Sequence, residues 1–149
     1  MRQQKATYSC GPAALSNAFK AYGRRISEAG VRLHSNTTKE GTDEFGLMAA
    51  TKALGFHYSV CEETNFVRAY EWLIERLRHG YPVLLCVSNW SHWVTALGSL
   101  GSRVTVFDPA SDPNIRKENG VYVYSQHRLR RLWQHRTDKQ YFAMAIIPA

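Results

Sequence analysis

Cys10 combines a nucleophilic residue type with a position that favours a reactive thiol. It is followed by Gly11 and Pro12 and then by small and apolar residues at helical spacing, so it lies at or just before the start of a helix. A thiol reacts as the thiolate, and the free N–H groups and dipole at a helix N-terminus lower the pKa of a cysteine there. Nucleophilic catalysis is the chemistry that this position predicts.

The other two cysteines lie in settings typical of inert thiols. Cys86 falls in PVLLCVS, a nearly continuous apolar run, and Cys61 lies at the end of a predicted strand. Three cysteines are an odd number, no secretion signal is present, and the close spacings of a zinc site are missing from the sequence. We therefore expect no disulfide framework, no metal and no cofactor.

A cysteine nucleophile needs a base, and one of the six histidines stands apart from the others. His92 opens the run HWVTALG, and the next β-rich run, RVTVFDP, carries Asp108 near its end. Antiparallel pairing of these runs places the two side chains near each other at one end of a sheet, as for a base and the acid that orients it. Asp108 also suits a simple turn, because Asp-Pro is a common way to begin one. The remaining histidines lie at a helix end, around a basic helix or in polar segments: His34, His57, His79, His127 and His135.

Gln4 is the candidate for the remaining requirement, an oxyanion donor. A side-chain amide beside the backbone N–H of the nucleophile can bind the oxygen that gains charge in a tetrahedral intermediate. Gln4 stands six residues before Cys10 and can reach back across the helix start, whereas Gln3 points the other way in an extended segment.

The elements that position these residues are mostly helical in the first half of the chain. Periodicity predicts helices from Cys10 to about Gly23, from the cap Ser27 to about His34, from the cap Thr42 to Gly55, and over VRAYEWLIERLRHG, with the run FHYSV as a strand. The last of these helices places one apolar face on the core, formed by Val67, Tyr70, Leu73, Ile74 and Leu77.

The second half is rich in strands. The runs PVLLCVS, HWVTALG, RVTVFDP and YFAMAII predict strands, with a turn from Gly98 to Gly101 that makes a hairpin of the middle two. A loop from Ala110 to Gly120 and a short basic helix capped by Ser125 precede the last strand. No internal repeat or linker divides the sequence, so we expect a single α+β domain over residues 1–149.

Charge and hydropathy exclude several classes of protein. The net charge is +7, but the basic residues are scattered in pairs such as Arg24 and Arg25, which is typical of a solvated surface rather than of a nucleic-acid arm. No run of 18 apolar residues and no signal-peptide pattern occurs, so we expect a cytoplasmic protein without a membrane span.

Four segments together resemble the bacteriocin-processing peptidases, papain-like domains that cut leader peptides after a double glycine and are often fused to ABC exporters. They are QKATYSCGPAAL, EGTDEFGLMAATKALGF, GYPVLLCVSNWSHWVTALG and RVTVFDPAS. The resemblance implies a papain-like fold with helices packed on an antiparallel sheet, Cys10 as nucleophile, His92 as base, Asp108 as its orienting acid and Gln4 as oxyanion donor. It also implies a peptide or protein substrate, with an exporter as a partner.

Two features depart from the family pattern and leave other functions open. No transmembrane or nucleotide-binding region follows in these 149 residues, and Trp90 and Trp93, on either side of His92, match no part of that pattern. The alternatives are a free-standing enzyme with a different substrate, an acyltransferase or deamidase that uses the same thioester, and a non-catalytic peptide-binding module.

Overall fold

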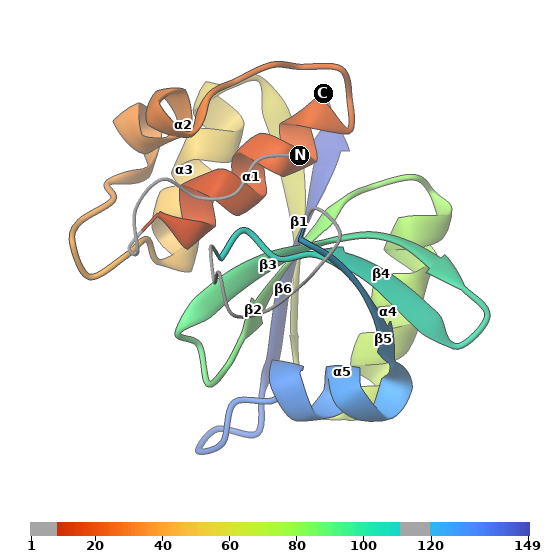
Figure 1. The fold of residues 1–149 in the computed structure, drawn as a ribbon. Helices are drawn as coiled ribbons and strands as arrows, with labels where there is room; N and C mark the ends of the chain where they lie inside the picture. Colours follow the sequence, from red (N-terminus) through yellow and green to blue (C-terminus); the bar gives the residue numbers. More distant parts are fainter. Residues whose placement is uncertain (1–8, 111–119) are drawn as a thin grey trace.

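The computed structural model describes residues 9–110 and 120–149, which form one six-stranded sheet between two layers of helices (Figure 1). The strands are β1 (Phe56–Glu63), β2 (Val83–Val87), β3 (His92–Leu100), β4 (Arg103–Phe107), β5 (Val121–Ser125) and β6 (Tyr141–Pro148). Their order across the sheet is β1-β6-β2-β3-β4-β5, and all neighbouring strands are antiparallel. The predicted α+β class is confirmed.

The first three helices cover one face of the sheet (Figure 1). They are α1 (Cys10–Lys20), α2 (Glu28–Ser35) and α3 (Glu44–Ala53). Ser27 caps α2 as predicted, because its hydroxyl accepts a 3.0 Å hydrogen bond from the N–H of Gly30. Apolar side chains of the three helices pack on β2 and β6, and the largest of these helix residues are Leu15, Phe19, Val31 and Leu47.

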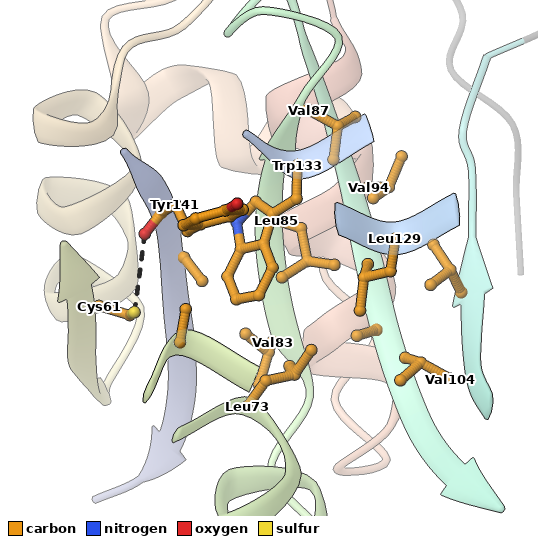
Figure 2. Packing of buried hydrophobic residues seen from close by; sticks show 14 of the residues in the cluster. Cys61, Leu73, Val83, Leu85, Val87, Val94, Val104, Leu129, Trp133 and Tyr141 are labelled. Carbon is orange, nitrogen blue, oxygen red and sulfur yellow. Dashed lines mark hydrogen bonds between the residues drawn. The ribbon is translucent and has the colours of Figure 1, made fainter. Parts of the chain in front are cut away.

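The opposite face is covered by α4 (Phe66–Arg78) and α5 (Gln126–Trp133). Figure 2 shows Leu73 of α4 and both Leu129 and Trp133 of α5 packed over the valines and leucines of β2, β3 and β4. The prediction that Val67 faces this core is wrong, since its side chain is 62% exposed. The reason is that α4 begins at Phe66, after the cap Asn65, and Phe66 takes the place against the core.

The last strand lies in the middle of the sheet rather than at its edge. β6 pairs with β1 on one side and with β2 on the other, so this C-terminal strand connects β1 to the other four strands of the sheet. Six of its eight residues are buried, from Tyr141 to Ile146. Cys61 therefore lies within β1 opposite Ala143, and not at a strand end as predicted, because β1 continues to Glu63.

The hairpin of β3 and β4 is confirmed, but its turn lies two residues later than predicted. β3 continues to Leu100, which pairs with Arg103, so Gly101 and Ser102 make the turn. Gly98 is inside β3, where the register shifts between Ala96 and Gly98. Of the two glycines only Gly101 has a positive φ, +60°, which a tight turn requires.

Two other local predictions are corrected. Asp43, not Thr42, caps α3, since its Oδ1 accepts a 2.8 Å hydrogen bond from the N–H of Gly46. Thr42 is buried, and its hydroxyl lies 2.6 Å from that of Thr37. β5 was not predicted, although its sequence VYVYS has the β-branched and aromatic residues typical of a strand; it is an edge strand with one buried residue. Ser125, at its end, caps α5 as expected.

Candidate active site

Cys10 is the first residue of α1 and lies against the beginning of β3. Its side chain is buried, with 7% exposed, and the helix that carries it is tied to the sheet by the hydroxyl of Thr95, which donates a 2.8 Å hydrogen bond to the carbonyl of Ala14. The sulfur is therefore held at a helix N-terminus, where backbone N–H groups have no partner within the helix.

The surroundings of Cys10 favour the thiolate. Burial acts to raise the pKa of its thiol, but the hydrogen bond with His92, the backbone N–H of Trp93, the positive charge of His92 and the N–H of Gly11 act against burial. Together they hold the pKa of Cys10 below its ordinary value of 9.0. The thiolate is thus stabilised by groups from two elements that are distant in the sequence.

His92 hydrogen-bonds to both Cys10 and Asp108. Its Nε2 lies 2.6 Å from Oδ1 of Asp108, and the two side chains are 19% and 16% exposed. Burial acts to lower the pKa of His92, but hydrogen bonds and negative charge from Asp108 and Cys10 raise it to about 9. The lowered pKa of Cys10 and the raised pKa of His92 both favour a thiolate beside an imidazolium.

Asp108 is held by backbone hydrogen bonds to both its N–H and its carboxylate. Its N–H donates a 2.9 Å hydrogen bond to the carbonyl of Gly120, and its Oδ1 accepts a 2.8 Å hydrogen bond from the N–H of Ala110. The same carboxylate oxygen therefore accepts from a backbone N–H two residues onward, as in a turn, and contacts the imidazole of His92.

The remaining predicted residues fall into two groups. Gln4 lies outside the described residues, and its role stays a prediction. Cys61 and Cys86 are both buried, and burial raises the pKa of the first to about 11 and that of the second to about 12. Within residues 9–110 and 120–149, no cluster of three or more histidine, cysteine or carboxylate side chains is suited to a metal ion, and no helix is long and apolar enough to span a membrane.

Trp93 contributes to the stabilisation of the Cys10 thiolate, a role that the sequence did not predict. Its backbone N–H hydrogen-bonds to the sulfur of Cys10, while its indole N–H donates a 3.0 Å hydrogen bond to the carbonyl of Thr42. A backbone donor has no residue-type signature, so sequence reasoning cannot find it. The only signal was the unexplained tryptophan directly after His92.

A thiol of lowered pKa at the start of a helix, joined to an imidazole that a carboxylate holds, defines together with this sheet a papain-like cysteine peptidase. The chain belongs to the Peptidase C39 family, whose profile matches residues 1–137. Membership in a peptidase family favours an enzyme over a non-catalytic binding module.

Two curated relatives are named as transport/processing ATP-binding proteins. The chain is 34% identical over 110 residues to the lactococcin transport/processing ATP-binding protein LcnC-like of Lactococcus lactis, and 30% identical over 103 residues to the mesentericin-Y105 transport/processing ATP-binding protein MesD of Leuconostoc mesenteroides. These alignments cover 72% and 67% of this chain but only 14% and 13% of the relatives, so the chain matches a small part of each.

Solved structures extend the similarity over the whole fold. The peptidase domain of Streptococcus ComA, a bifunctional ABC transporter, superposes with a TM-score of 0.77 at 27% identity, covering 99% of this chain and 97% of that domain. A double glycine motif protease from an AMS/PCAT transporter, solved with its leader peptide, gives a TM-score of 0.71 at 16% identity and covers 100% of this chain and 90% of that one. The second comparison shows a shared fold alone.

Proposed function

We propose that this peptidase cleaves a leader peptide after a Gly-Gly pair, with Cys10 as nucleophile, His92 as base, Asp108 as the acid that orients His92, and Gln4 as oxyanion donor. The observation that carries the proposal is the hydrogen-bonded series from the Cys10 thiol through His92 to Asp108. The names of two relatives join transport with processing, which supports a leader peptide as substrate and an exporter as the partner that receives the product. We place this reaction in the cytoplasm, where the leader is still attached.

The chemistry follows from the charges of the pair. The Cys10 thiolate attacks the carbonyl carbon of the scissile bond, and the oxyanion is bound by the Cys10 N–H and the Gln4 amide. The His92 imidazolium then gives its proton to the leaving amine, and a thioester remains on Cys10. Neutral His92 next takes a proton from water, which hydrolyses the thioester and restores the thiolate and imidazolium.

Incubation of the protein with a synthetic Gly-Gly leader peptide tests the proposal. The expected product is a single cut after the second glycine, and the Cys10→Ala protein should give none, because the members of a triad act as a unit. Cys61→Ala is the matched control, since Cys61 is a buried cysteine in the core on the opposite face of the sheet from α1. Cleavage that persists in the Cys10→Ala protein would refute the assignment of the nucleophile.

The mass of the product decides between the reactions that share the thioester. Hydrolysis yields a free carboxylate, acyl transfer yields a new amide, and deamidation changes a glutamine side chain without breaking the chain. A substrate peptide of unchanged length would therefore contradict a peptidase reaction on this substrate.

A further inference from the structure

A pocket of about 510 Å³ opens beside the candidate active site. Trp93 belongs to both the candidate active site and the pocket, because its backbone N–H hydrogen-bonds to the Cys10 sulfur while its side chain lines the pocket. Gly11 also faces this region, since a Cβ added there would lie 3.3 Å from Trp93 and 3.2 Å from Thr42, another lining residue. A peptide bound across Cys10 therefore has room for a large side chain here.

Aromatic rings form one side of the pocket. Trp90, Trp93 and Phe142 line it. The Phe142 ring lies edge-on to both tryptophans, and its centroid is 6.2 Å from that of Trp90 and 6.0 Å from that of Trp93. The Trp90 ring also packs against His135, with 4.6 Å between the ring centroids, and the residue remains 36% exposed.

Trp90 is held in place by an unusual loop. Ser88, Asn89 and Trp90 all have φ between +53° and +64°, a conformation that is rare for residues other than glycine. The loop is anchored to the end of α5 and the segment after it, because the N–H of Ser88 bonds to the carbonyl of Leu132 and the side chain of Asn89 accepts from the N–H of Arg136.

The pocket also carries negative charge, in a chain whose net charge is +7. Glu40, Asp43 and Glu44 line it, and its described lining includes no lysine, arginine or histidine. Asp43 is used as the cap of α3, but neither glutamate side chain makes a hydrogen bond or ion pair with a described residue. The charge of Glu44 reaches the pocket interior, since it adds to burial in raising the pKa of Cys86, which also lines the pocket.

We propose that this pocket receives a cationic side chain, arginine or lysine, of the peptide substrate close to the scissile bond. A guanidinium or ammonium group is attracted to the face of a tryptophan and pairs with a carboxylate, and a pocket with both features favours a cation over a neutral side chain of equal size. The proposal rests on the proposed function, because the cation belongs to the peptide that Cys10 cleaves. It also assigns a role to the two tryptophans that flank His92.

Arginine and citrulline substrates test the charge preference, because the two side chains are nearly equal in shape and only arginine is charged. A Gly-Gly leader peptide is synthesised with arginine or citrulline at each of the three positions before the Gly-Gly pair and each of the three positions after the scissile bond, and kcat/KM is measured. We expect arginine to exceed citrulline about tenfold at one position, the effect of a cation–π contact combined with a carboxylate. A ratio near one at every position overturns the proposal.

Variants locate the preference in the pocket. A protein with Glu40→Gln and Glu44→Gln should bring the ratio of arginine to citrulline near one, and Trp90→Leu should lower it by removing the ring face. Glu71→Gln is the matched control, since this exposed carboxylate lies on α4, across the sheet, and should keep the wild-type ratio. If the double variant keeps the wild-type ratio of arginine to citrulline, the pocket is not the source of the preference and the proposal is overturned.

Binding to the Cys10→Ala protein separates this inference from the proposed function. Titration calorimetry with the arginine and citrulline peptides should show tighter binding of arginine by a similar factor. If the Cys10→Ala protein binds the arginine peptide more tightly but the wild type cleaves neither peptide, the proposed function is contradicted and the cation preference of the pocket is supported. If the wild type cleaves both peptides and neither assay shows a preference, the proposed function is supported and the cation preference is overturned.

Discussion

Nε2 of His92 lies 2.6 Å from Oδ1 of Asp108, so the first residue of β3 contacts the residue that follows the end of β4. This contact occupies one ring nitrogen and leaves Nδ1 for the thiol of Cys10. It also places a negative charge behind the imidazole, which favours the protonated ring beside the thiolate.

The pH dependence of the reaction should be bell-shaped. Activity rises as Cys10 loses its proton, and this occurs below the ordinary 9.0 because its pKa is lowered. Activity falls as the pH passes about 9, where His92, raised from 6.5, loses the proton that the leaving amine needs. Measurement of kcat/KM from pH 5 to 10.5 checks both limbs, whose midpoints belong to the coupled pair. Activity that only begins to rise near pH 9 would contradict the lowered pKa of Cys10.

Asp108→Asn should narrow that profile and lower its maximum. Removing the carboxylate removes the largest influence that raises the pKa of His92, so the alkaline limb moves to lower pH. The rate at the optimum should fall by up to about 10⁴-fold, as when the orienting acid of a triad is lost.

Asp138→Asn is the control for this prediction. The Asp138 carboxylate lies 3.4 Å from another histidine, His135, so its loss changes an aspartate–histidine pair outside the candidate triad. The pH profile should stay as in the wild type. An unshifted alkaline limb in the Asp108→Asn protein would mean that Asp108 does not act on His92 during turnover.

Alkylation should distinguish the three thiols. Iodoacetamide at pH 7 should label Cys10 and spare Cys61 and Cys86, since burial raises the pKa values of those two to about 11 and 12. Peptide mapping by mass spectrometry locates the label, and the unfolded protein, in which all three thiols react, is the control. Equal labelling of the three in the native protein is the contrary result.

Gln4→Ala should slow turnover by about 10² to 10³-fold, the usual effect of removing one oxyanion donor. Because the amide acts on the tetrahedral intermediate, kcat should fall more than KM changes. Gln3→Ala is the neighbouring control and should keep the wild-type rate. A normal rate in the Gln4→Ala protein would remove Gln4 from the mechanism and leave the other three residues in place.

Gly46→Ala should destabilise the fold. A Cβ at this position would lie 2.1 Å from the carbonyl oxygen of Ser35, so α2 and α3 would have to separate, at a cost of about 1 to 3 kcal/mol in unfolding free energy. Urea unfolding measures the loss. Gly98→Ala is the matched control, since it has no neighbour within 4 Å of the added atom. Equal stabilities of the two variants would show that α2 and α3 do not approach as closely as described.

Local features were predictable because they depend on neighbours a few residues apart. The start of α1 at Cys10 follows from Pro12 and the helical spacing after it, and the caps Ser27 and Ser125 follow from side chains that bond three residues onward. The pairing of His92 with Asp108 is also close to local, because one hairpin joins the strands that carry them. The turn and the cap of α3 were misplaced by one or two residues, since several nearby residues fit each role equally well.

Residue types and their spacing therefore specify which side chains could carry acyl chemistry and which elements present them. Three relationships depend on the tertiary structure: β6 lies between β1 and β2, the N–H of Trp93 reaches the Cys10 sulfur, and acidic residues before and in α3 line one pocket with aromatic rings of β3 and β6. These relationships join segments far apart in the chain. They depend on burial and on the packing of whole elements, which no pattern of neighbouring residues specifies.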